Sequence, residues 1–226
     1  MSTFTSRKKV FAGIAVAAIA SLPLAACSSS DDGDDATVSN SSEVVAEITA
    51  LTGEDTAVLL DAGFAGALES LGLTPGTVGD GELVDGSLVF PITGGNVTYF
   101  TPGTASPYVI GQVQHEGSGF SLSAGDITVE ITNLNVDPGV SRVYGDVSVN
   151  GELVASSAYI FTLNGSTLNP LDVQGDTAVL QGTEVYVSPV AAGLLNSTFG
   201  TDAVTEDLLV GIATITVNTT SGDDGN

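Results

Sequence analysis

The chain has 226 residues, of which 27 are acidic and only four are lysine or arginine, so its formal net charge at pH 7 is −23. So few basic side chains cannot neutralise a phosphate backbone, which excludes nucleic acid as a partner. The chain has a single cysteine, which excludes an internal disulfide, so a folded domain must be stabilised by burial of apolar side chains. The length suits one domain with a sizeable core.

Residues 1–26 have the features of a secretory signal peptide. Arg7, Lys8 and Lys9 precede an apolar run of mainly small side chains that ends at Ala26. This run is shorter than the roughly 20 apolar residues that a permanent membrane span needs. We therefore expect residues 1–26 to direct secretion and to be removed.

Cys27 ends the sequence Leu-Ala-Ala-Cys at 24–27, which resembles the lipobox of bacterial lipoproteins. The resemblance implies cleavage before Cys27, acylation of its sulfur and acylation of the new amino group. Several acyl chains anchor a protein stably, whereas one chain binds only marginally. The alternative is an ordinary secretory signal with an incidental cysteine. We expect a membrane-anchored protein on the extracytoplasmic side of a membrane of the bacterial cell envelope.

Residues 27–42 are rich in serine and aspartate and have no apolar periodicity, which predicts a flexible acidic tether. Residues 43–218 are expected to form a single β-rich domain, and residues 219–226 a disordered tail. Removal of residues 1–26 leaves all 27 acidic residues, with Arg142 as the only lysine or arginine. Such a charge favours solubility and disfavours close contact of the domain with anionic headgroups.

The start of the domain is predicted to be helical. EVVAEITAL at 43–51 is a short amphipathic stretch, and TGED at 52–55 resembles a capping box before DTAVLLDAGFAGALESLG. Apolar side chains recur at helical spacing up to Leu71, and Gly72 is expected to end the helix.

From Thr77 onward the apolar period changes to two. Asp85-Gly86 and Asn150-Gly151 are typical of tight hairpin turns. Strand-like stretches recur about every 8–12 residues between turn residues, as in sandwiches and barrels. Ser188-Pro189 predicts the start of a helix. The expected fold is mainly β, an antiparallel β-sandwich or open barrel with an N-terminal helical segment and one late short helix.

His115 is the only histidine, and it is expected at a strand end beside a glycine-rich turn. It is either a half-exposed structural residue, a ligand of a metal or haem, or a general base. Zinc sites use three or four protein ligands, which one histidine with carboxylates does not match. No G-x-S-x-G motif surrounds a serine, and we expect no enzyme activity. Paired carboxylates leave an acid-dependent hydrolase as the enzymatic alternative.

Asp80, Glu82 and Asp85 alternate around the sequence GDGELVDG and are the candidate ligands for calcium. Carboxylate oxygens are the ligands that Ca²⁺ prefers. Aspartates in turns also serve turn geometry alone, and no EF-hand spacing is present.

The order of motifs across residues 57–217 resembles HtaA-type domains, which are β-rich domains of bacterial surface proteins. The motifs are FAGALESLGLTPGTV, DGSLVFPITGG, HEGSGFSL and VYVSPVAAGLLNSTFG, followed by LLVGIATITV. In haem-binding relatives a tyrosine near the first helix and a histidine before a glycine turn serve the iron. The resemblance places His115 near that histidine, whereas Ala67 stands about where the tyrosine would be. Tyr99 and Tyr108 are the tyrosines that could replace it.

The sequence thus predicts a lipid-anchored, non-enzymatic surface protein with a structural or partner-binding β domain and no cofactor. Its partner, a protein or a small ligand, is not identified by any motif. The alternative is a module that binds haem or another metal-centred ligand through His115 and a tyrosine. That alternative requires His115 to line an apolar, partly open pocket, and a buried or isolated His115 counts against it.

Overall fold

The computed structural model describes residues 42–219. The predicted signal peptide, Cys27 and nearly all of the predicted tether therefore lie outside the described residues, as do residues 220–226. The described residues lie in one compact unit, which contains the hydrophobic core. No helix among the described residues is long and apolar enough to cross a membrane.

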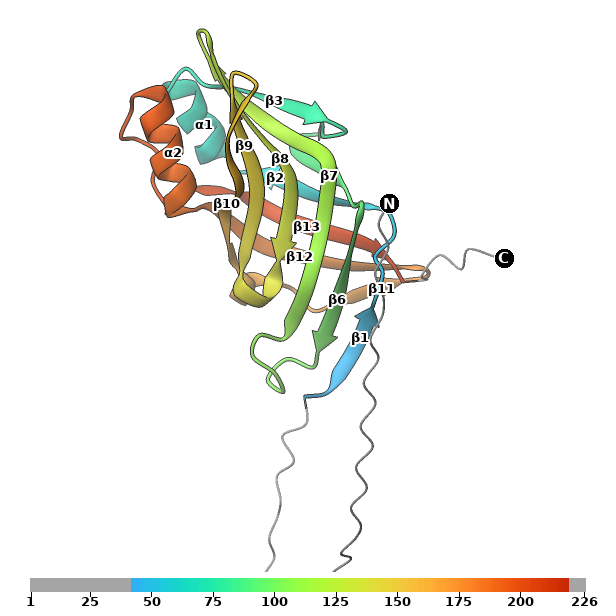
Figure 1. The fold of residues 1–226 in the computed structure, drawn as a ribbon. Coiled ribbons are helices and arrows are strands. Elements are labelled where there is room, and N and C mark those ends of the chain that lie inside the picture. Colours follow the sequence, from blue (N-terminus) through green and yellow to red (C-terminus); the bar gives the residue numbers. More distant parts are fainter. Residues whose placement is uncertain (1–41, 220–226) are drawn as a thin grey trace, which may run out of the picture. The chain divides into compact units, whose positions relative to one another are not determined.

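Within residues 42–219 the strands form one large antiparallel sheet, and two α-helices accompany it, which confirms the predicted mainly β fold (Figure 1). In chain order the elements are β1 (Val44–Ile48), β2 (Asp55–Leu60), α1 (Ala62–Ser70), β3 (Thr74–Gly79), β4 (Glu82–Val84), β5 (Ser87–Pro91), β6 (Gly94–Phe100), β7 (Val109–Ala124), β8 (Ile127–Asp137), the 3-10 turn η1 (Pro138–Val140), β9 (Arg142–Val149), β10 (Glu152–Asn164), the 3-10 turn η2 (Gly165–Thr167), β11 (Asp172–Gln174), β12 (Thr177–Val187), α2 (Pro189–Phe199) and β13 (Leu209–Asn218).

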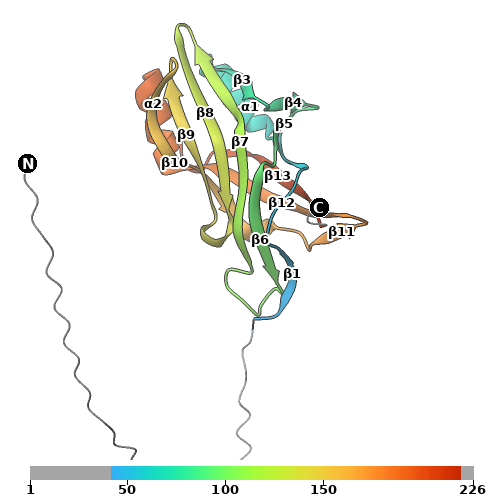
Figure 2. The same cartoon turned by 45° about the vertical axis from the view of Figure 1, so that its right-hand side comes forward.

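The strand order is β1-β6-β7-β8-β9-β10-β12-β13-β2-β5-β4, with β3 paired to β7 and β11 paired to β12. The sheet curls so that its two halves face each other without closing, as the crossing of β12 and β13 behind β7 and β8 illustrates (Figures 1 and 2). Phe90 of β5 and Phe120 of β7 meet across the interior, with ring centroids 6.5 Å apart. The core therefore lies between two layers, as in a sandwich.

Two hairpins form at the predicted turns. Asp85 and Gly86 connect β4 to β5 with φ values of 49° and 81°. Asn150 and Gly151 connect β9 to β10 with φ values of 51° and 81°. Positive φ at both central residues is the geometry that Asn-Gly and Asp-Gly adopt readily, and its twist matches that of the flanking strands.

The prediction of helix was wrong for residues 43–60. Residues 44–48 form β1, which pairs with β6, and residues 55–60 form β2, which lies between β13 and β5. The sequence 52–55 is not a helix cap, because it leads into a strand. The apolar side chains of β2 fit both a helical and an extended period, and backbone pairing on both sides of β2 decides between them.

The first helix, α1, begins only after Asp61. The Asp61 carboxylate accepts hydrogen bonds from the backbone N–H groups of Gly63 at 2.7 Å and Phe64 at 3.3 Å, which makes Asp61 the N-cap. Gly72 follows the last turn with a φ of 67°, in agreement with the predicted end of the helix.

The second helix, α2, begins as predicted. The Ser188 hydroxyl accepts a hydrogen bond from the backbone N–H of Ala191 at 3.0 Å, and Pro189 is the first helical residue. Both helices lie at one end of the curled sheet (Figure 1). They bury Phe64 and Leu68 from α1 and Leu195 from α2 in the core, together with side chains of both layers. The helices therefore fill this end of the interior.

Candidate ligand-binding site

An apolar cavity of about 480 Å³ lies between the two layers, towards the end that carries β1, β11, η1 and η2. Most of its lining side chains are valine, leucine, isoleucine and phenylalanine. Exposed Glu47, Val173 and Thr219 also line it and mark its opening. Small-molecule sites in proteins commonly have volumes of about 300–1,000 Å³ and a mainly apolar lining with a few polar groups. The cavity has these properties.

His115 lines this cavity and is only 1% exposed. It lies within β7, a strand of 16 residues, so the expectation of a half-exposed residue at a strand end was wrong. The glycine-rich segment after it is a β-bulge rather than a turn, because the pairing of β7 with β8 shifts between His115 and Gly119. Gly117 has a φ of 77° within this bulge, a conformation that glycine adopts without strain.

Both ring nitrogens of His115 have partners. Nδ1 lies 3.2 Å from the carbonyl oxygen of Leu134, and Nε2 lies 2.8 Å from Oγ1 of Thr56. Phe90 packs edge-on against the imidazole, with ring centroids 6.3 Å apart. Burial lowers the pKa of His115 from 6.5 to about 4, although the hydrogen bond to Leu134 acts in the opposite direction. The imidazole is therefore neutral near pH 7.

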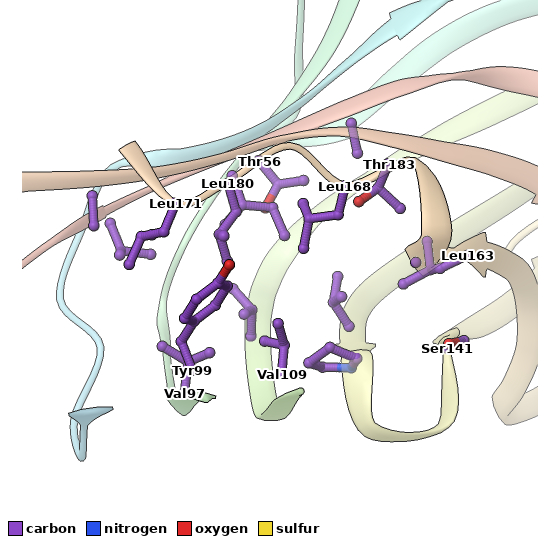
Figure 3. Close-up of a pocket in the computed structure, with 18 of the residues that line it drawn as sticks. Thr56, Val97, Tyr99, Val109, Ser141, Leu163, Leu168, Leu171, Leu180 and Thr183 are labelled. Carbon is purple, nitrogen blue, oxygen red and sulfur yellow. The ribbon is translucent and has the colours of Figure 1, made fainter. Parts of the chain in front are cut away.

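Tyr99 and Tyr108 line the same cavity as His115. Their rings meet edge-on with centroids 5.9 Å apart. The Tyr108 hydroxyl donates a hydrogen bond to the carbonyl oxygen of Gly165 at 2.9 Å, whereas the Tyr99 hydroxyl has no partner among the described residues. Figure 3 shows the Tyr99 ring pointing into the cavity, with its hydroxyl away from β6. Tyr99 thus offers the cavity a free polar group.

The helix α1 does not contribute to the cavity. Ala67 instead lines a separate small cavity of about 30 Å³ between the helices and the sheet. A side chain at Ala67 therefore faces the end of the interior that the helices fill. The tyrosines that do line the large cavity come from β6 and from the segment just before β7.

Thr56 is the cavity residue that sequence reasoning missed. It is 5% exposed and forms the hydrogen bond to His115 from the opposite layer. Assigning residues 55–72 to a helix placed Thr56 in the first turn, where a threonine does not indicate a buried functional residue. A β-branched polar residue in an apolar stretch was the available signal, because a buried hydroxyl needs a hydrogen-bond partner.

The acidic residues do not gather at this cavity. Asp80, Glu82 and Asp85 lie at or beside β4 and do not line it. No group of three or more His, Cys, Asp or Glu side chains within residues 42–219 is arranged to hold a metal ion. Glu47 is the only acidic residue that lines the large cavity, which therefore lacks the pair of carboxylates that the hydrolase alternative needs.

Arg142 lies on the outer side of β9 and does not line the cavity. Its guanidinium carbon lies 4.4 Å from the centroid of the Tyr159 ring, in a cation–π contact. The pKa of Arg142 is raised, mainly because its side chain forms a hydrogen bond with Tyr144. The only lysine or arginine of residues 42–219 is thus engaged outside the cavity.

No protein-family model and no curated protein matches the sequence. Among solved structures, the C-terminal domain of HtaA from Corynebacterium glutamicum aligns with a TM-score of 0.54 and 14% identity, over 76% of this chain and 99% of that domain. A domain-swapped dimer of a histidine-to-alanine variant of the same domain aligns with a TM-score of 0.46 and 14% identity, over 70% of this chain and 92% of that one. The first alignment shows that this chain has an HtaA-like fold.

Proposed function

We propose that this protein is a non-enzymatic, lipid-anchored binding protein of the bacterial cell envelope, whose β domain holds a largely apolar ligand of the haem class. Anchoring through Cys27 follows from the lipobox resemblance. The ligand class follows from the HtaA-like fold together with the cavity lined by Tyr99, Tyr108 and His115. The observation that carries the proposal is the Tyr99 hydroxyl, which has no partner among the described residues and lies in a mainly apolar cavity.

The donor set of the cavity fits a haem. Tyrosine and histidine are both established axial ligands of haem iron. The Tyr99 hydroxyl has no partner among the described residues, so it can bind a ligand without breaking a bond within the protein. Apolar walls provide the burial that dominates the binding of a large, mainly hydrophobic molecule.

When bound, haem supplies a metal centre for coordination and a broad apolar surface for packing. The protein's part is to position the phenol of Tyr99, to hold Tyr108 beside it and to exclude water from the interior. Because no lysine or arginine lines the cavity, the acidic groups of a haem are expected at the opening, in contact with solvent.

A hydrolytic role has little support from this geometry. Glu47 is exposed at the opening, and no second acid lines the cavity with it. Glu206 and Asp207 line a separate open groove beside Tyr186, where both carboxylates are exposed. A binding role accounts better for a mainly apolar interior cavity whose polar lining consists mostly of tyrosine, serine and threonine side chains and a neutral imidazole.

Titration of residues 40–226 with hemin, followed by absorbance, tests this function. We expect saturable one-to-one binding that weakens about tenfold or more in Tyr99→Phe. Tyr186→Phe, on the outer face of β12, is the matched control and should bind like the parent. Absence of saturable binding would contradict the haem proposal and favour a purely structural or protein-binding role.

A further inference from the structure

The hydrogen bonds of His115 define which of its nitrogens carries the hydrogen. A carbonyl oxygen can only accept, so the contact of 3.2 Å with Leu134 places the hydrogen on Nδ1. Nε2 of a neutral imidazole is then an acceptor. The Thr56 hydroxyl, 2.8 Å away, must therefore donate to Nε2. The lone pair that would bind a metal is already in use within the protein.

Packing holds both partners in this arrangement. His115 is 1% exposed and Thr56 is 5% exposed. Thr56 lies within β2, opposite Phe90 of β5 and Ile215 of β13, so its backbone is fixed on both sides. The edge-on Phe90 ring lies 6.3 Å from the imidazole and limits its rotation. Breaking the pair would leave a buried acceptor unsatisfied, which is costly.

We propose that Thr56 prevents His115 from binding a metal centre, so that a metal-centred ligand in this cavity binds through Tyr99 alone. This inference rests on the proposed function for the identity of the ligand, but not for the Thr56–His115 pair itself. Tyr108 is disfavoured for a different reason, because its hydroxyl donates to the carbonyl oxygen of Gly165 and loss of the phenolic proton would break that hydrogen bond. When Tyr99 binds a metal, its phenolic proton leaves to solvent as the oxygen forms the new bond. His115 then joins the two layers of the sheet beside the cavity and does not bind the metal.

Removal of the Thr56 hydroxyl should allow His115 to replace Tyr99 as the group that binds the metal. Thr56→Ala removes both the O–H group and the methyl group, which leaves Nε2 unpaired beside the cavity with no side-chain atom in the place of Oγ1. The variant should therefore bind hemin through His115. Thr56→Ser retains the hydroxyl and should behave like the parent chain. His115→Asn should leave the coordination by Tyr99 intact in the parent background.

Resonance Raman and electron paramagnetic resonance spectra of hemin-loaded residues 40–226 give the first test. The parent and His115→Asn should both show a phenolate-bound iron, and Thr56→Ala should show a histidine-bound iron. In the Thr56→Ala background, Tyr99→Phe should lose less than about threefold in affinity, compared with about tenfold or more in the parent. A histidine-bound iron in the parent, or spectra that do not change in Thr56→Ala, would overturn the inference.

A second measurement does not depend on hemin. The chain has one histidine, so ¹⁵N NMR of residues 40–226, freed of any affinity tag, reports a single imidazole. We expect a protonated Nδ1 and an unprotonated, hydrogen-bonded Nε2 at pH 7, and a shift of the Nε2 signal in Thr56→Val. A protonated Nε2 or fast exchange between tautomers would overturn the inference. If hemin does not bind but the NMR spectra are as expected, the proposed function is wrong. The hydrogen bond between Thr56 and His115 is then still supported.

Discussion

Nε2 of His115 and Oγ1 of Thr56 lie 2.8 Å apart and join the two layers of the sheet beside the cavity. His115 belongs to β7 and Thr56 to β2, which are separated by many strands in the sheet order. The bond forms only because the sheet curls and brings these strands face to face. It therefore depends on the global fold as well as on the local site.

Loss of the Thr56 hydroxyl should destabilise the domain. Thr56→Val leaves the buried Nε2 acceptor without its donor, and we expect a loss of about 1–3 kcal/mol in the free energy of unfolding. Thr56→Ser keeps the donor and loses only a methyl group, so it should cost about 1 kcal/mol. Urea denaturation of residues 40–226 measures both. An equal loss in the two variants would show that packing, rather than the hydrogen bond, explains the cost.

The stability of the domain should depend on pH through His115. The folded-state pKa is about 4 against an ordinary value of 6.5, so the unfolded chain binds the proton more readily. Stability contributed by the neutral imidazole is therefore present above pH 6.5 and is lost as the pH falls towards about 4. The lowered pKa of His115 corresponds to a contribution of about 3 kcal/mol to the free energy of unfolding above pH 6.5.

Urea denaturation between pH 7.5 and pH 4 checks this dependence in the parent and in His115→Asn. Carboxylates also titrate in the lower part of this range, so the informative quantity is the difference between the two stability curves. That difference should narrow as the pH falls, because the parent alone loses the imidazole contribution. Parallel curves would contradict a depressed pKa for His115.

The N-cap of α2 should contribute measurably to stability. The buried Ser188 hydroxyl accepts a hydrogen bond from Ala191 and donates one to the carbonyl oxygen of Tyr159. Ser188→Ala should cost about 1–2 kcal/mol in the free energy of unfolding. Ser197→Ala in the same helix is the control, because Ser197 is exposed and bonds only within α2, and it should change stability by less than about 0.5 kcal/mol. Similar losses for both would contradict this role of Ser188.

Lipid anchoring should depend on Cys27. In cells that express the full chain, Cys27→Ser should abolish incorporation of labelled fatty acid and move the protein from the membrane fraction to the soluble fraction. Ser28→Ala leaves the lipobox intact and should behave like the parent chain. Labelled, membrane-bound Cys27→Ser protein would contradict anchoring through this residue.

The parts of the fold that are specified locally could be predicted from the sequence. Asn150-Gly151 and Ser188-Pro189 fix backbone geometry through their own side chains, and both features are found where expected. The sequence 55–60 could not be assigned in this way. Its apolar spacing suits a helix, and only pairing with β13 and β5, which are distant in the chain, makes it a strand.

The candidate site also combines features that the local sequence indicates with features that depend on distant parts of the chain. His115 and the tyrosines were identifiable as residue types, yet the burial of His115 depends on long-range packing between layers. The hydrogen bond to Thr56 spans 59 positions in the chain, so local patterns carry no sign of it. The place of Tyr99 in the cavity likewise depends on where β6 lies in the curled sheet, whereas no residue of α1 lines the cavity.

The most direct measurement is an anomalous difference map at the iron absorption edge, from crystals of residues 40–226 grown with hemin. We predict one strong iron peak inside the cavity, within coordination distance of the Tyr99 hydroxyl oxygen and farther from Nε2 of His115. An iron peak on the outer surface, or crystals with an intact cavity and no iron in it, would contradict the proposed function. A peak bound to Nε2 of His115 would support haem binding and contradict the role assigned to Thr56.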